Sequence, residues 1–94
     1  MGEAGSRATN YLGLHLANPF LVLDLSPNAS VEMVERKGEL LISMLTVGMT
    51  EATSYQTPFG PRERTSELVR EALAELRDPN RRLVHEWRLQ EMEP

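Results

Sequence analysis

The junction between the last two predicted helices reads Ala72-Leu73-Ala74-Glu75-Leu76-Arg77-Asp78-Pro79-Asn80-Arg81-Arg82-Leu83-Val84-His85-Glu86. Before Asp78, apolar residues recur at the three-and-four spacing of a buried helical stripe: Leu68, Val69, Ala72, Leu73 and Leu76. Asp78 is a favourable N-cap, and Pro79 suits the first position of a helix, where its missing N–H has no intrahelical partner. The stretch therefore predicts one helix capped by Thr65 or Ser66, and another that begins at Pro79 and carries Leu83, Val84, Trp87 and Leu89.

Two further helices are predicted upstream by the same capping chemistry. Asn18 and Pro19 begin a short helix that ends near Asp24, and Ser30 caps a longer helix from Val31 to about Val47. The longer helix has a core-facing stripe with a small residue in its middle: Val34, Gly38, Leu41 and Leu45. Glycine there weakens the helix by up to ~1 kcal/mol relative to alanine. We expect Gly38 to permit close contact with a neighbouring helix.

Length and composition fit one small globular domain. The chain has 94 residues, of which 40% are hydrophobic and 26% charged, and these are ordinary values for a folded domain. We predict a loose tail over residues 1–17, a helical domain over 18–90 and a frayed end over 91–94. Residues 48–64 contain Thr, Ser, Pro and Gly without a consistent period, which is typical of a loop. The predicted fold class is all-α.

In combination, these features resemble the J-domain (DnaJ-like) family. The resemblance rests on residues 18–30 and on Asp78-Pro79-x-Arg81-Arg82 after the Ala72-containing helix, and it covers about residues 18–87. It implies a four-helix fold with a long antiparallel hairpin of the second and third helices. Where the family has its chaperone-contacting His-Pro-Asp, this chain has Thr46-Val47-Gly48, and its second helix lacks a basic run. We therefore expect a divergent J-like protein that does not stimulate DnaK-type chaperones.

A second apolar stripe on the long helix is the main candidate binding surface. Leu40, Met44 and Val47 fall at helical spacing on a face separate from the core stripe. Either the following loop folds back over this stripe, or the stripe contacts a partner protein or a second copy of the chain. Tyr55 and Phe59 in the loop are apolar anchors for either arrangement. The predicted partner-binding residues are thus Leu40, Met44, Val47, Tyr55 and Phe59.

Residues able to carry out catalysis or bind metal are few. The chain has no cysteine, so it offers no disulfide, thiolate ligand or thiol nucleophile. His15 and His85 are too far apart in sequence for a local metal motif, and the glutamates alternate with Arg and Lys as on solvated helix faces. We expect no enzyme activity, cofactor, metal or small-molecule substrate.

Charge and hydropathy narrow the remaining classes of function. The net charge is -4, and acids surround the arginines at positions 77, 81, 82 and 88, so we do not expect nucleic-acid binding. The longest apolar stretch, Leu40 to Met49, is shorter than the roughly 20 residues of a membrane span. We expect a cytoplasmic, noncatalytic J-like adaptor, scaffold or regulator that binds another protein or itself. The alternatives are an atypical cochaperone of a DnaK-type chaperone and a nucleic-acid-associated regulator.

Overall fold

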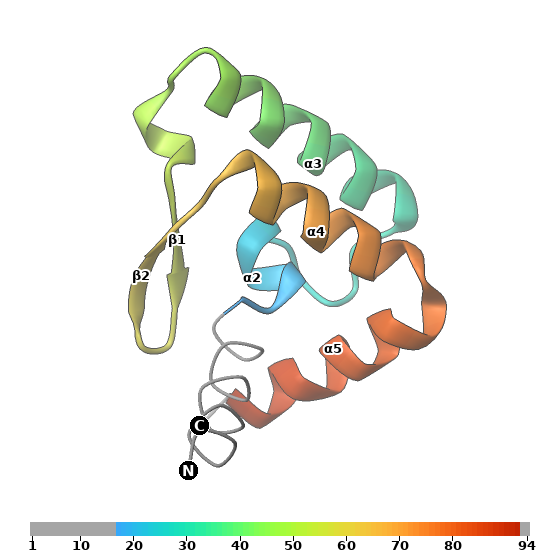
Figure 1. The fold of residues 1–94 in the computed structure, drawn as a ribbon. Coiled ribbons are helices and arrows are strands. Elements are labelled where there is room, and N and C mark those ends of the chain that lie inside the picture. Colours follow the sequence, from blue (N-terminus) through green and yellow to red (C-terminus); the bar gives the residue numbers. More distant parts are fainter. Residues whose placement is uncertain (1–16, 93–94) are drawn as a thin grey trace, which may run out of the picture.

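The computed structural model describes residues 17–92, with the side chains of 17–90 (Figure 1). The elements in chain order are α2 (Pro19–Leu23), α3 (Val31–Thr46), a 3-10 turn η1 (Thr50–Ala52), β1 (Ser54–Thr57), β2 (Gly60–Glu63), α4 (Ser66–Arg77) and α5 (Pro79–Met92). The tail predicted for residues 1–17 lies outside the described residues apart from Ala17. Within the predicted frayed end, residues 93–94 also lie outside them, whereas Glu91 and Met92 belong to α5.

The helix ends follow the capping residues that the sequence predicts. The side chains of Asn18, Ser30 and Thr65 accept hydrogen bonds from the backbone N–H groups of Phe20, Met33 and Leu68. The carboxylate of Asp78 accepts from the N–H groups of Asn80 and Arg81 at the start of α5. Each cap satisfies donors that have no partner within the helix. The four predicted helices are therefore all present, and their starts agree with the predictions.

Helices α3 and α4 lie side by side and run in opposite directions (Figure 1). Gly38 permits their close approach, because a Cβ added there would lie 2.5 Å from Cδ2 of Leu73. About one turn away, the guanidinium of Arg77 donates two hydrogen bonds to the carboxylate of Glu35, at 2.7 and 2.8 Å. The expectation for Gly38 is confirmed.

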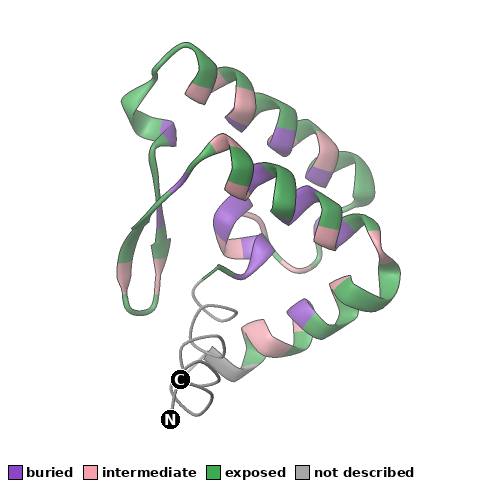
Figure 2. Ribbon diagram, viewed as in Figure 1, coloured by how far each residue is buried: buried purple, intermediate pink, exposed green. Residues whose placement is uncertain are grey.

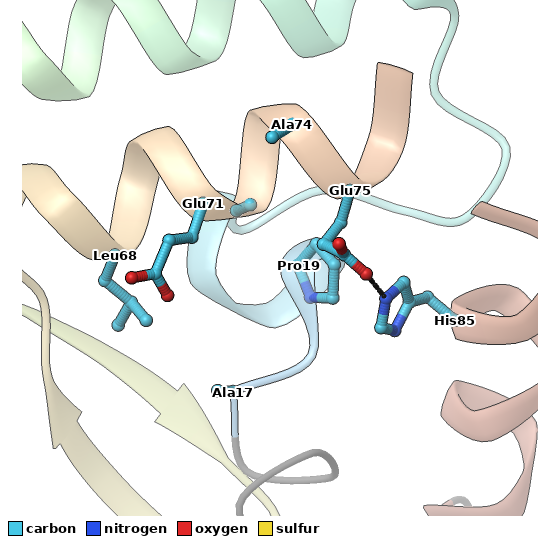
Figure 3. A pocket seen from close by; sticks show the side chains of 8 residues that line it. Ala17, Pro19, Leu68, Glu71, Ala74, Glu75 and His85 are labelled. Carbon is cyan, nitrogen blue, oxygen red and sulfur yellow. Dashed lines mark hydrogen bonds and ion pairs between the residues drawn. The ribbon is translucent and has the colours of Figure 1, made fainter. Parts of the chain in front are cut away.

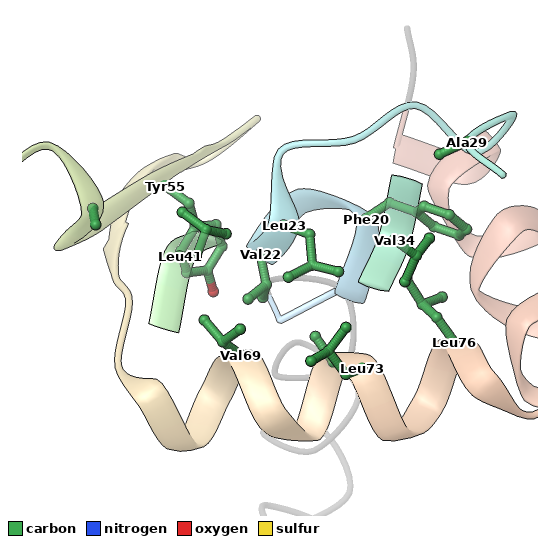
Figure 4. Packing of buried hydrophobic residues seen from close by; sticks show 12 residues of the cluster. Phe20, Val22, Leu23, Ala29, Val34, Leu41, Tyr55, Val69, Leu73 and Leu76 are labelled. Carbon is green, nitrogen blue, oxygen red and sulfur yellow. The ribbon is translucent and has the colours of Figure 1, made fainter. Parts of the chain in front are cut away.

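The core surrounds α2, which packs against α3, α4, α5 and β1. The side chains of Phe20, Val22 and Leu23 are completely buried. They meet the inward faces of α3 and α4 and the hairpin, through Val34, Leu41, Tyr55, Val69, Leu73 and Leu76 (Figure 4). Buried residues thus line the sides of α3 and α4 that face α2, and exposed ones the opposite sides (Figure 2).

The all-α, J-domain-like fold class predicted from the sequence is wrong. Strands β1 and β2 pair as an antiparallel hairpin in the stretch predicted to be a loop, with Tyr55 opposite Arg62 and Thr57 opposite Gly60. Pro58 fixes a backbone angle suited to a tight turn, and Gly60 adopts a φ of 110°. The Thr57 hydroxyl accepts from the N–H of Phe59 and donates to the carbonyl of Gly60. The fold is therefore mainly helical with a two-stranded sheet.

Candidate protein-binding surface

The second stripe predicted on α3 is only partly available to a partner. Leu40 is 52% exposed and Val47 is 73% exposed. Met44, by contrast, is partly buried and packs against the core cluster. The alternative in which residues 48–64 cover the stripe is therefore wrong for Leu40 and Val47, because the hairpin packs against α2 instead.

The two predicted aromatic contacts lie in different environments. Tyr55 is buried and belongs to the same core cluster as Leu41 (Figure 4). Burial is the main reason why its pKa is raised above the ordinary value of 10.0. Phe59 lies in the turn between the strands and is exposed. The hairpin therefore uses Tyr55 to attach itself to the domain, and of the two aromatic side chains Phe59 is the one accessible to a partner.

Sequence reasoning missed Met33, which is the third exposed residue on this side of α3. Met33, Leu40 and Val47 are seven residues apart, close to two helical turns, and we call them the α3 patch. A shallow depression of about 300 Å³ joins Leu40 to Met33 and to Leu25 in the preceding loop, between Arg36 and Lys37. The seven-residue spacing is visible in the sequence, although Met33 also fits an ordinary exposed position near the start of a helix.

Basic side chains flank the α3 patch without being neutralised. Among residues 17–92, no ion pair involves Arg36 or Lys37. Arg77, by contrast, is paired with Glu35, whose pKa is lowered mainly by that hydrogen bond. The α3 patch is therefore an apolar surface with two available cations.

Thr46, Val47 and Gly48 terminate α3. The hydroxyl of Thr46 donates to the carbonyl of Ile42 at 2.7 Å, and Gly48 has a φ of 78°. A left-handed glycine just after the last helical turn is a common way to end a helix, because it lets the next N–H groups reach the final carbonyls. These residues supply a hydroxyl and an alkyl group, and neither an imidazole nor a carboxylate.

A buried histidine lies between α4 and α5, next to a depression of about 390 Å³ (Figure 3). Nε2 of His85 lies 2.9 Å from Oε1 of Glu75, whose other oxygen accepts from Arg81 at 2.9 Å. The hydrogen bond with His85 is the largest cause of the lowered pKa of Glu75. The described lining residues include no Ser, Thr or Cys for the pair to activate, and residues 17–92 contain no metal-binding cluster of three His, Cys, Asp or Glu. The geometry thus supports a link between helices.

The arginines at the junction of α4 and α5 are largely occupied by acids and carbonyls. Arg81 pairs with Glu75 and Asp78. Arg82 pairs with Glu86 and donates to the carbonyls of Pro27 and Ala29. These contacts use guanidinium donors that a phosphate would otherwise need.

The chain matches no protein-family model, no curated protein and no solved structure. Within the part of the chain that the structure describes, no helix has the length and apolar character needed to cross a membrane.

Proposed function

We propose that this chain is a noncatalytic protein-protein interaction module, an adaptor, scaffold or regulator, that binds its partner through the α3 patch. One observation carries the proposal: Met33, Leu40 and Val47 are 50%, 52% and 73% exposed along one side of a single helix. Several apolar side chains that remain exposed on one side of a helix are typical of interaction sites, because binding a partner removes their apolar surface from water.

The charges around the α3 patch indicate the kind of partner. Arg36 and Lys37 lie beside Leu40 without an ion pair among the described residues, so carboxylates at the edge of the partner would complement them. Such pairs mainly increase the association rate and exclude wrong partners. The chain resembles J-domains but has Thr46-Val47-Gly48 where the family has its chaperone-contacting motif. This difference supports a role without chaperone stimulation. The cytoplasmic location expected from the sequence is part of the proposal.

The test is affinity capture from the native cell with matched variants of α3. Leu40→Asp combined with Val47→Asp introduces charge into the patch and should weaken capture of a defined partner by about tenfold or more, since each buried aliphatic side chain contributes ~1.5 kcal/mol or more. Val31→Asp is the control: Val31 is also exposed, but at about 100° per residue it lies on the opposite side of α3 from Leu40. Circular dichroism should show equal helicity in all variants. Recovery of the same proteins with every variant would refute the proposal.

A further inference from the structure

Helix α5 has an apolar outer surface that belongs to neither the core nor the α3 patch. Its inner side contributes the buried His85 and the partly buried Leu89. Its outer side exposes Leu83, Val84 and Trp87, which line a shallow depression together with Gln90. We call Leu83, Val84 and Trp87 the α5 patch. Trp87 is the only tryptophan of the chain and is 63% exposed.

A cationic group adjoins the α5 patch. Val84 also lines a second depression, which Arg81, His85 and Arg88 share with Glu75. Glu75 already accepts hydrogen bonds from His85 and Arg81. Arg88 has no ion pair among residues 17–92, and its buried Nη1 atom has no hydrogen-bond partner there. Arg88 lines this depression, so a carboxylate that enters the depression would pair with its guanidinium.

The charges also decide which occupant fits. Two copies of α5 packed face to face in antiparallel orientation would bring Arg81 and Arg88 against the same residues of the other copy, which is unfavourable. Nucleic acid is disfavoured by Glu75, Asp78 and Glu86 around the site. A protein segment with apolar side chains and a flanking carboxylate could cover the α5 patch and also pair with Arg88.

We propose that the α5 patch is a second docking surface, which receives an amphipathic helix of a partner protein and binds one of its carboxylates at Arg88. Helices α3 and α5 lie on opposite sides of α4 (Figure 1). The two patches lie on different helices and share no residue, so binding at one leaves the residues of the other available. This goes beyond binding at the α3 patch and does not depend on it.

The experiment uses the emission of Trp87, which shifts to shorter wavelength when its ring leaves water. The probe is a synthetic peptide of about 16 residues, long enough to form a helix alone, with leucines along one face and glutamates along one flank. The matched peptide has glutamine in place of every glutamate. The glutamate peptide should give a saturable shift, and the glutamine peptide should bind about two- to fivefold more weakly. No saturable shift with the glutamate peptide, or equal affinity for both peptides, would overturn the proposal.

Variants of the chain locate the binding. Arg88→Gln should abolish the preference for the glutamate peptide, and Leu83→Asp should weaken both peptides by about tenfold or more. Leu40→Asp with Val47→Asp should leave the titration unchanged. If only that α3 double variant lost the peptide-dependent shift in Trp87 emission, the proposal would be overturned and the proposed function would remain intact. If the Trp87 emission shifted when the concentration of the chain was raised without peptide, the α5 patch would bind a second copy of the chain. That result would also overturn the proposal.

Discussion

The side chain of Arg64 donates from Nε to the carbonyl oxygen of Val22 at 2.8 Å, and so connects the end of the hairpin to the centre of the core. Its Nη1 also donates to the carbonyls of Ala52 and Ser54, at 3.2 and 3.1 Å. The guanidinium lies 5.8 Å from the centre of the Tyr55 ring. Arg64 is buried, and burial lowers its pKa below the ordinary value. One side chain therefore joins the backbones of α2, η1 and β1.

Replacing Arg64 with methionine should destabilise the domain by about 3 kcal/mol, because the change leaves buried carbonyl oxygens without donors. Urea unfolding followed by circular dichroism measures the loss. Arg70→Met is the matched control, since Arg70 is exposed on α4 and has no hydrogen bond or ion pair among the described residues. Equal unfolding midpoints for the two variants would show that the Arg64 contacts do not stabilise the fold.

Gly38→Ala should destabilise the domain by about 1–2 kcal/mol. The added methyl group meets Leu73, and the cost of overpacking exceeds the gain in helix propensity. Leu73→Ala removes the obstructing side chain, so Gly38→Ala should be neutral or stabilising in that background. A double-mutant cycle measured by urea unfolding tests this. Additive effects of the two changes would contradict the predicted contact.

Stability should fall in acid partly through Glu75. Its pKa is lowered from the ordinary value of 4.5, mainly by the hydrogen bond with His85 and further by Arg81. A carboxyl group with a lowered pKa stabilises the fold above its unfolded pKa and loses this contribution as the pH falls through its folded pKa. Between about pH 6 and pH 3, Glu75→Gln should therefore lose less stability than the unaltered chain. Identical pH profiles for Glu75→Gln and the unaltered chain would contradict the prediction.

Equimolar addition of this protein to a DnaK-type chaperone should leave ATP turnover at its unstimulated rate. Thr46, Val47 and Gly48 end α3 and present no imidazole or carboxylate for a charged contact. Removing one member of a charge-paired interface costs a few kcal/mol, which is enough to abolish a weak transient complex. A steady-state ATPase assay with a true J-protein as positive control measures this, and clear stimulation by this chain would contradict it.

The helices could be predicted from the sequence because their ends depend on local chemistry. Asn18, Ser30, Thr65 and Asp78 cap them through hydrogen bonds that span two or three residues, so the pattern is visible without tertiary information. The Gly38 contact was also predictable, because glycine inside an apolar stripe weakens the helix and is favoured there when a second helix packs closely against it.

The hairpin could not be predicted in the same way. Its strands are four residues long, and β2 begins Gly60-Pro61, a pair that normally indicates a turn. The contacts that stabilise the hairpin are with residues distant in sequence: Tyr55 is buried in the core, and Arg64 donates a hydrogen bond to the carbonyl of Val22, 42 residues away. For the same reason the sequence placed Tyr55 on a binding surface and missed Met33, since exposure depends on which neighbours cover each side chain.

The central position of α2 governs when the domain can form during synthesis. The amide of Asn18 donates to the carbonyl of His85, 67 residues later, and α2 also packs against α4. Translation produces α2 before α4, so the apolar residues of α2 lack their main packing partner until α4 has been made. Ribosome-bound chains that stop before Ser66 should therefore remain sensitive to protease, and resistance should appear only in longer chains that include α4 and α5.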